Sequence, residues 1–427
     1  DRLDRPLDAA RARATIGDAL WNADRLEAAL ERLQSAYETL ASTSTPEVAA
    51  LAAQYGRIRY FAASDETGVR EALPPIERAM EIAEAGSLGS VLSDAMNTKS
   101  LILDSLHRPE ESYALLEHSL SIALDHDAMP AAMRAYNNLS NFMWGRDRYA
   151  DARSYEEAGR ELADRTGYRN QWWFLTGHVG NILYLTGEWD ELEQLWQEVD
   201  RQREDPAAEF AVIPIDYVWA LVQGVGRGDV DAFLRLVESM RKLIHSEEFQ
   251  GRTFGEILMA NTALLTGTPE DAIPHVERVL NSRDLLGGSH WLFKTGLELG
   301  IQAAFAVNKL DRAESIIAGA AAIPPGERSP LLDATVAGYG ARVAARRGAD
   351  DAEIEAGFRE AERIFMEIGD PFHRAQNLLA HAEWLATTER SGEALVVAGD
   401  AAEIFRTLRA TPWIERAERL APAVVVS

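Results

Sequence analysis

Carboxamide side chains recur in this sequence at a regular spacing. Asn141, Asn181, Asn261 and Gln302 follow one another at intervals of 40, 80 and 41 residues. A carboxamide both donates and accepts hydrogen bonds, so a column of them can bind an extended peptide backbone whatever its side chains are. The same amides can instead bond to the backbone of a neighbouring helix and set the spacing between helices, as buried asparagines commonly do. Both interpretations stay open at the level of the sequence.

Polar and aromatic residues near these amides extend the candidate site. Asn137 and Asn141 are one helical turn apart and must share a face. Trp144, Phe174 and Tyr184 would place aromatic surface beside the amides, a mixture found in peptide and small-molecule sites, although each can equally belong to the core between helices. Phe254, Glu298 and Arg342 lie on or near the same predicted wall. The candidate binding residues are Asn97, Arg134, Asn137, Asn141, Trp144, Phe174, Asn181, Tyr184, Asn261 and Gln302.

Residues that could support catalysis or bind a metal lack the spacing that such sites require. The nine histidines include no His-Glu-x-x-His motif. His373 and His381 are eight residues apart on one helical face, which makes half a metal site or, more simply, a solvated or hydrogen-bonded pair. The glycines of GVGRGD (224–229) follow a predicted helix rather than a strand, so we expect a turn and no nucleotide loop. We therefore expect no catalytic residue, no metal, no cofactor and no enzyme activity.

Charge and composition limit the partners. With 43 Lys and Arg against 68 Asp and Glu, the net charge is −25, which repels nucleic acid and anionic membranes. The absence of cysteine excludes disulfides and thiolate metal sites and fits a cytoplasmic location. The most apolar stretch, 210–225, is interrupted by a proline and an aspartate and is shorter than the roughly 20 residues of a membrane span. Arg342, Arg346 and Arg347 form a basic cluster, which either receives an acidic segment of a partner or reflects favourable charge at a helix end.

The elements that position these residues follow an internal repeat of about forty residues. NNLSNFMWGRDRYADA (137–152) and HVGNILYLTGEWDELE (178–193) share one order of helix, turn and helix. Five residues after the turn position, seven of ten units have Ala or Ser, beginning at Ala28 and with Leu192, Phe233 and Glu353 as exceptions. A small side chain at this place allows close helix packing. The turn position recurs at Ala23, Thr67, His107, Asp147, Gly187, Gly228, Gly267, Asn308, Gly348 and Glu389.

This unit resembles the tetratricopeptide repeat, whose pattern runs Asn-Leu-Gly, Gly-x-Tyr and then Ala. The matching residues are Asn138, Leu139, Tyr149 and Ala152 in one unit, and Gly187, Trp189, Gly267 and Ala272 in others. The period exceeds the usual ~34 residues, so longer helices and a different pitch are expected. The resemblance implies an all-α fold, a right-handed superhelical α-solenoid of about ten helix-turn-helix repeats. We expect it to form one domain over 1–427, with possible hinges at 285–290 and 323–330.

The same resemblance locates the binding surface. In such solenoids the first helices line the concave wall, and the position six residues before the turn faces the groove. In the third to eighth units that position is occupied by Leu101, Asn141, Asn181, Val222, Asn261 and Gln302. In peptide-binding tetratricopeptide proteins an asparagine there holds the peptide backbone, so the resemblance implies a protein, peptide or small effector bound in the groove.

The longer period is similar to the helical-repeat region of large bacterial signalling proteins, namely ATPase-bearing adenylate or guanylate cyclases and LuxR-type regulators with a MalT-like sensor. FMEIGDPFHRAQNLLAHAEWL (365–385) and IFRTLRATPWIERAERL (404–420) look like their closing repeats. The cyclases are the closer match. This implies a non-catalytic regulatory domain that signals to an adjoining ATPase or catalytic module, and the start at Asp1 is what we expect of a piece of a larger protein. The alternatives are the sensor of a LuxR/MalT-type transcription regulator and a free-standing scaffold.

Overall fold

The computed structural model describes residues 6–23, 25–40 and 42–420, and over these ranges it consists of helices and turns without a β-strand. The prediction of an all-α solenoid is confirmed. The first half contains α1 (Pro6–Asn22), α2 (Leu26–Leu40), α3 (Pro46–Phe61), α4 (Glu66–Glu71), α5 (Leu73–Ala85), α6 (Gly89–Ser105), α7 (Pro109–Asp125), α8 (Met129–Gly145), α9 (Tyr149–Thr166), α10 (Arg169–Leu185), α11 (Trp189–Arg201) and α12 (Glu209–Leu221).

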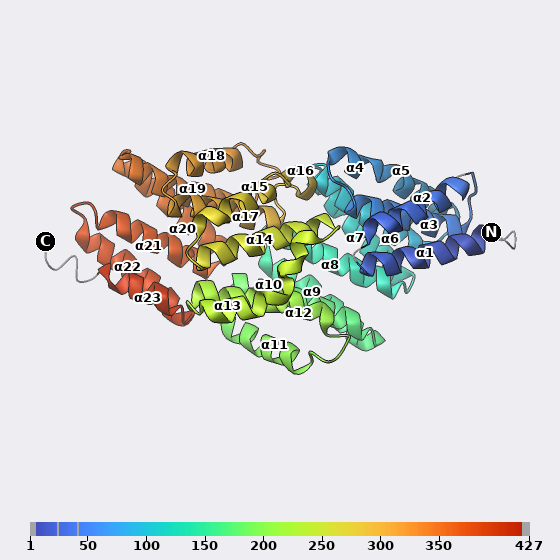
Figure 1. Ribbon diagram of the computed structural model, residues 1–427, viewed down its shortest axis with the longest axis horizontal. Helices are drawn as coiled ribbons and strands as arrows, with labels where there is room; N and C mark the ends of the chain where they lie inside the picture. Colours follow the sequence, from blue (N-terminus) through green and yellow to red (C-terminus); the bar gives the residue numbers. More distant parts are fainter. Residues whose placement is uncertain (1–5, 24, 41, 421–427) are drawn as a thin grey trace.

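The second half begins with a π-helical turn and ends with a short helix near the C-terminus. Its elements are η1 (Val222–Gly226), α13 (Val230–Val237), the 3-10 helix η2 (Glu238–His245), α14 (Phe249–Leu265), α15 (Pro269–Leu280), α16 (Arg283–Leu286), α17 (Trp291–Ala306), α18 (Leu310–Ala321), α19 (Pro330–Arg347), α20 (Asp351–Ile368), α21 (Pro371–Leu385), α22 (Ser391–Thr407) and α23 (Thr411–Glu418). Ten helix hairpins result, from α1–α2 to α21–α22, and α23 stands where an eleventh would begin (Figure 1). None of these described helices is long and apolar enough to cross a membrane.

The predicted turn position has a left-handed backbone in seven successive hairpins, with φ between 55° and 79° at His107, Asp147, Gly187, Gly228, Gly267, Asn308 and Gly348. In six of these hairpins the next residue donates its N–H to a carbonyl five residues back, as Arg148 does to Met143 and Glu188 to Leu183, both at 2.9 Å. This bond satisfies a carbonyl that the helix end leaves open. The prediction is wrong in the second hairpin, where Thr67 lies inside α4 because Asp65 caps that helix and moves the turn upstream.

The small-residue position is buried in most hairpins, with Ala152, Ala272 and Ala313 fully inaccessible. Two predicted positions are wrong by one residue. Ala29 and Ile354 are buried in place of Ala28 and Glu353, because the turns before them are one residue longer.

In the fifth and sixth hairpins the small-residue position holds a large side chain, and a glycine of the preceding helix faces it. A Cβ on Gly180 would lie 3.5 Å from Leu192, and one on Gly224 would lie 2.9 Å from Phe233. Gly224 and Gly226, which the sequence places in a turn, belong to the π-helical η1, and the turn itself follows at Gly228. Both glycines are needed for packing, because a Cβ on Gly226 would lie 2.8 Å from the Trp189 ring. The two helices of a hairpin can thus approach closely because either of them can contribute the small residue.

Successive turns of the superhelix touch each other. The turn of one hairpin meets the start of the first helix five hairpins further on. Asp147 Oδ2 accepts the Leu331 backbone N–H at 2.6 Å, 184 residues away. The same separation joins Gly187 to Pro371 and Gly228 to Pro412, whose ring carbons leave no room for a Cβ on either glycine. Figure 1 shows α21 to α23 beside the α10 to α13 region, with the first hairpins at the opposite end.

The two predicted hinges take part in this contact between superhelical turns. Ser105 Oγ donates to the Leu285 carbonyl at 2.8 Å, and His107 Nδ1 lies 2.9 Å from Glu327 Oε2. Both segments therefore pack on the third hairpin. Bending at 285–290 or 323–330 stays a prediction, and these bonds would have to break for it to occur.

Candidate functional site

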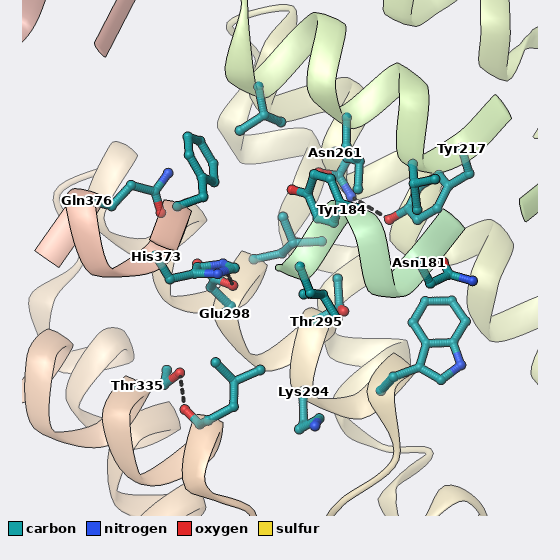
Figure 2. A pocket seen from close by; sticks show the side chains of 18 of the residues that line it. Asn181, Tyr184, Tyr217, Asn261, Lys294, Thr295, Glu298, Thr335, His373 and Gln376 are labelled. Carbon is teal, nitrogen blue, oxygen red and sulfur yellow. Dashed lines mark hydrogen bonds and ion pairs between the residues drawn. The ribbon is translucent and has the colours of Figure 1, made fainter. Parts of the chain in front are cut away.

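A cavity of about 120 Å³ lies inside the superhelix, which is room for a small molecule rather than for a single water. Its wall comes mainly from the first helices of the fourth to tenth hairpins: α8, α10, α12, α14, α17, α19 and α21 (Figure 2). This matches the expectation that first helices face inward. The apolar wall includes Trp144, Tyr149, Leu185, Tyr217, Val218, Leu221, Val225, Trp291, Leu299 and Phe372. The polar lining residues are Asn181, Tyr184, Asn261, Lys294, Thr295, Glu298, Gln302, Thr335, His373 and Gln376.

Five of the ten candidate binding residues line this cavity, namely Trp144, Asn181, Tyr184, Asn261 and Gln302. The amide column therefore converges on one space from α10, α14 and α17. Asn261 also has an internal partner, because its Nδ2 donates to the Ile257 carbonyl at 3.1 Å. Gln302 Nε2 donates to Glu298 at 3.0 Å and to the Tyr339 hydroxyl at 3.2 Å. The binding role of these residues stays a prediction.

The other five candidates lie outside the cavity. Asn97 and Asn137 are buried and are joined through the side chain of Asn138, while Arg134 bonds to the Asp94 carbonyl and to Thr98 Oγ1 at 3.1 and 2.8 Å. These bonds tie α6 to α8. This agrees with the second interpretation of the amides, in which they set the spacing between helices. Asn141 and Phe174 are half-buried and belong to α8 and α10. The sequence predicted a wall along the third to eighth hairpins, but only residues from the fourth hairpin onward line the cavity.

A charged triad crosses the cavity wall between α17 and α21. Asp370 Oδ2 lies 2.6 Å from His373 Nδ1, and His373 Nε2 lies 3.2 Å from Glu298 Oε2. Although burial disfavours the charge, Asp370 and Glu298 together raise the pKa of His373 well above its usual value. Burial would raise the pKa of Glu298, but the imidazolium and the hydrogen bonds of Tyr339 and Gln302 lower it. The wall therefore holds a cation between two carboxylates.

This triad corrects the sequence-based view of His373 and His381 as a pair. His373 bonds to the two carboxylates, whereas His381 stacks on the Phe358 ring with centroids 5.0 Å apart. Asp370 accepts the His373 backbone N–H at 3.1 Å as the N-cap of α21, which fixes the spacing of carboxylate and imidazole. The signal in the sequence was Asp-Pro-x-His at the helix start. Among the described residues no three His, Asp or Glu side chains are grouped so as to hold a metal ion.

A buried ion pair closes the opposite side of the cavity. Lys294 Nζ contacts Asp147 Oδ1 and donates to the Gly145 carbonyl at 2.9 Å. Both side chains are almost inaccessible, at 4% and 0% exposure. Because Asp147 also caps the start of α19, one carboxylate links α17, α19 and the turn after α8. The ammonium is thereby occupied, and it is not free for a ligand.

Several lining groups keep unused hydrogen-bonding capacity. The side chains of Asn181, Tyr184, Thr295 and Gln376 make no hydrogen bond to another described residue. Figure 2 shows Asn181, Tyr184 and Thr295 around the cavity from three directions. Next to them Trp144 stacks on Trp291, with ring centroids 5.1 Å apart and planes 15° apart. Aromatic surface beside a few unpaired polar groups is the composition of a small-molecule site.

The sequence-based list lacks Lys294, Thr295, Thr335, His373 and Gln376. A signal was available on α17, because residues 291, 294, 295, 298 and 302 follow one another at steps of three, one, three and four and so share one helical face. That face carries an aromatic ring, a cation, a hydroxyl, a carboxylate and an amide. Such a mixture is unusual for an inner helix of a solenoid core and marks the wall of a site.

No protein-family model matches this sequence, and no curated protein matches it. Two solved structures are similar in chain path. The yeast Tom70 crystal structure has a TM-score of 0.34 and 13% identity and covers 96% of this chain and 95% of its own. The P58(IPK) TPR domain has a TM-score of 0.23 and 12% identity, with coverage of 84% and 98%. At these TM-scores neither likeness carries an argument, and the assignment of the fold depends on the helices described above.

Proposed function

We propose that this chain is a non-catalytic sensory repeat domain that binds a small polar effector inside its superhelix. The observation that carries the proposal is the cavity in which Asn181, Tyr184, Thr295 and Gln376 lack partners beside the stacked rings of Trp144 and Trp291. The polar atoms of these four residues are accessible in the cavity, so a ligand can bond to them without displacing a partner inside the protein, while the two indole rings cover its apolar part. Binding of such a ligand would then lower the free energy of the folded protein relative to its empty form.

The contacts between superhelical turns favour a small effector over an extended peptide. A peptide that adds its backbone to a column of amides needs an open groove along several hairpins. Here the contact of Asp147 with Lys294 and Leu331 joins two superhelical turns across that path. A peptide partner would enter with one side chain or one terminus only. A protein partner is proposed to bind the outer helices.

We further propose that the domain belongs to a cytoplasmic bacterial signalling protein and regulates an adjoining ATPase or cyclase module. The support is the resemblance of 365–385 and 404–420 to the closing repeats of such cyclases. The sensor of a LuxR/MalT-type regulator and a free-standing scaffold are the alternatives. Sequencing the gene on both sides of this segment discriminates them: a cyclase module, a helix-turn-helix, or no further domain.

The effector proposal is tested with a thermal-shift screen of small polar metabolites against three proteins. Thr295→Phe fills the cavity, whereas Thr262→Phe introduces the same ring on α14, outside the cavity lining. Compounds that raise Tm in the wild type are expected to act on the Thr262→Phe variant and to have no effect on Thr295→Phe. Equal stabilisation of both variants, or no stabilising compound for the wild type, contradicts the proposal.

A further inference from the structure

Arg342 and Arg346 lie one turn apart on α19, and neither has a carboxylate within ion-pair distance among the described residues. Their neighbour Arg347 pairs with both Asp311 and Glu314. In a chain with 68 acidic residues and a net charge of −25, two adjacent guanidinium groups without an acid need a physical account. Favourable charge at the end of α19 would apply to all three arginines. It therefore does not explain why only Arg342 and Arg346 lack a carboxylate partner.

Aromatic rings hold both guanidinium groups in place. Arg342 lies over the rings of Phe305 and Tyr339, 4.9 and 4.7 Å from their centroids. Arg346 lies over the same Phe305 ring at 4.6 Å. Cation–π contacts of this kind orient a guanidinium without using its N–H donors, so the donors stay available.

The two cations also repel each other. Burial, and then the nearby charge of Arg342, lower the pKa of Arg346 below its usual value. A like-charge pair on one ring is unfavourable unless an anion joins it. The position of the pair therefore favours binding of an anion from solution or from a ligand.

Arg342 connects this pair to the effector cavity. A second cavity of about 30 Å³ is lined by Arg342, Tyr339 and Asn377 together with Glu298, Thr335, His373 and Gln376. The last four residues also line the main cavity, so the two spaces are adjacent. Glu298 is a carboxylate in this second space, but its Oε2 pairs with His373 and its Oε1 accepts from Gln302. Arg342 therefore makes no ion pair with Glu298, although both residues line this second cavity.

We propose that Arg342 and Arg346 form an anion subsite that receives the phosphate or carboxylate group of the effector. This inference relies on the proposed function for the organic part of that ligand, whereas the affinity for a simple anion depends on the arginines alone. The planar guanidinium presents paired N–H donors that match two oxygens of either group. The effector would then bind with its polar body near Thr295 and Asn181 and its anionic end at Arg342.

The experiment measures binding of inorganic phosphate by isothermal titration, with acetate as a second probe that distinguishes phosphate from carboxylate preference. The wild type is compared with Arg342→Gln/Arg346→Gln, with Arg347→Gln as the matched control. We expect the double variant to bind phosphate or acetate at least about tenfold more weakly, because it loses two charged hydrogen-bond donors. Arg347→Gln should bind like the wild type. Arg342→Lys/Arg346→Lys, which keeps the charge and loses the paired donors, should bind with intermediate affinity.

The outcomes separate this subsite from the proposed function. If the wild type binds neither probe, or the double variant binds as tightly as the wild type, the subsite is overturned. Anion binding that needs the arginines, combined with a screen that yields no effector, supports the subsite and contradicts the sensory proposal. An effector that is lost in Thr295→Phe and unaffected in the double variant supports the sensory proposal and overturns the subsite. Circular dichroism of each variant confirms its helical content.

Discussion

At the residue scale, the carboxylate of Asp147 joins parts of the chain that are far apart in sequence. It pairs with Lys294, accepts the N–H of Leu331 and sits in a turn with φ of 59°, a conformation that aspartate and asparagine tolerate better than most residues. Removing two such charges from water is costly, and the cost is offset only while both partners and their hydrogen bonds are in place. The stability of the junction therefore depends on the pair as a unit.

Replacing one partner of this pair should destabilise the protein strongly. We expect Lys294→Met to lower the free energy of unfolding by roughly 3–5 kcal/mol, since it leaves the Asp147 carboxylate buried without its cation. Asp147→Asn in the Lys294→Met background should recover part of the loss. Arg347→Gln, which breaks two exposed ion pairs, should change the free energy of unfolding little, because solvent screens such pairs. Urea denaturation measures all three, and a loss for Lys294→Met as small as that for Arg347→Gln contradicts the prediction.

The triad around His373 predicts a pH dependence of stability. The pKa of His373 is raised in the folded state, so its contribution is fully present below the unfolded pKa of about 6.5 and is lost as pH rises through the folded pKa. His178 and His290 have lowered pKa values, about 4 and 3, and are uncharged in both states well above pH 6.5. We therefore expect the Tm difference between the wild type and His373→Asn to shrink as the pH is raised above about 6.5. A constant difference over this range would mean that the imidazole is not charged.

At the scale of the helix, glycine on the first helix and alanine on the second are two solutions to the same packing requirement. The sequence revealed the alanine position because it recurs at a fixed distance from the turn. The glycines escaped notice because their place depends on which large residue faces them. On α17, a Cβ at Gly296 would lie 2.2 Å from Val279 Cγ1 of α15.

Gly296→Ala should accordingly destabilise the protein by about 1–3 kcal/mol through overpacking. Gly319→Ala in α18 is the control, because no heavy atom lies within 4 Å of its Cβ position. It should stabilise by roughly 0.5–1 kcal/mol, since alanine favours the helix. Adding Val279→Ala should remove the clash in the Gly296→Ala variant. Thermal denaturation of the four proteins measures these effects, and equal values for Gly296→Ala and Gly319→Ala would refute the packing account.

At the scale of the molecule, successive turns of the superhelix contact each other. Hairpins that are far apart in the sequence are thereby joined. Repeat proteins usually interact only between neighbours along the chain, so their stability is a sum of local terms. Here Trp413 Nε1 donates to the Val225 carbonyl at 2.8 Å and Arg409 pairs with Asp190 at 2.7 Å, across about five hairpins. These contacts couple distant hairpins and hold together the two superhelical turns that form the walls of the cavity described above.

Cross-linking tests this closure directly, because the chain has no cysteine of its own. Asp190→Cys/Arg409→Cys should be joined by a short bismaleimide in the native protein and should remain unlinked in denaturant. The control pair Ser35→Cys/Arg409→Cys places one cysteine on α2 and the other in the turn after α22. These elements lie at opposite ends of the molecule (Figure 1), so this pair should not be linked. An open superhelix would leave both pairs unlinked, which would also remove the enclosed cavity.

The sequence by itself determined the helical hairpins, their forty-residue period and the position of the turn from the third to the ninth hairpin. These features follow from backbone hydrogen bonds and packing between adjacent helices, which act over a few residues and repeat along the chain. The same regularity places Asn181, Asn261 and Gln302 on the cavity wall, and their role in binding stays a prediction.

The tertiary structure alone decided how one superhelical turn meets the next. The pitch is the sum of small rotations at every hairpin, each set by the sizes of the packed side chains, so a contact across 184 residues cannot be obtained from any one repeat. That sum brings Asp147 to Leu331 and Glu298 to His373, and it leaves Arg342 without an acidic partner at the end of the cavity. The site depends on these placements because its groups come from hairpins that share no local pattern.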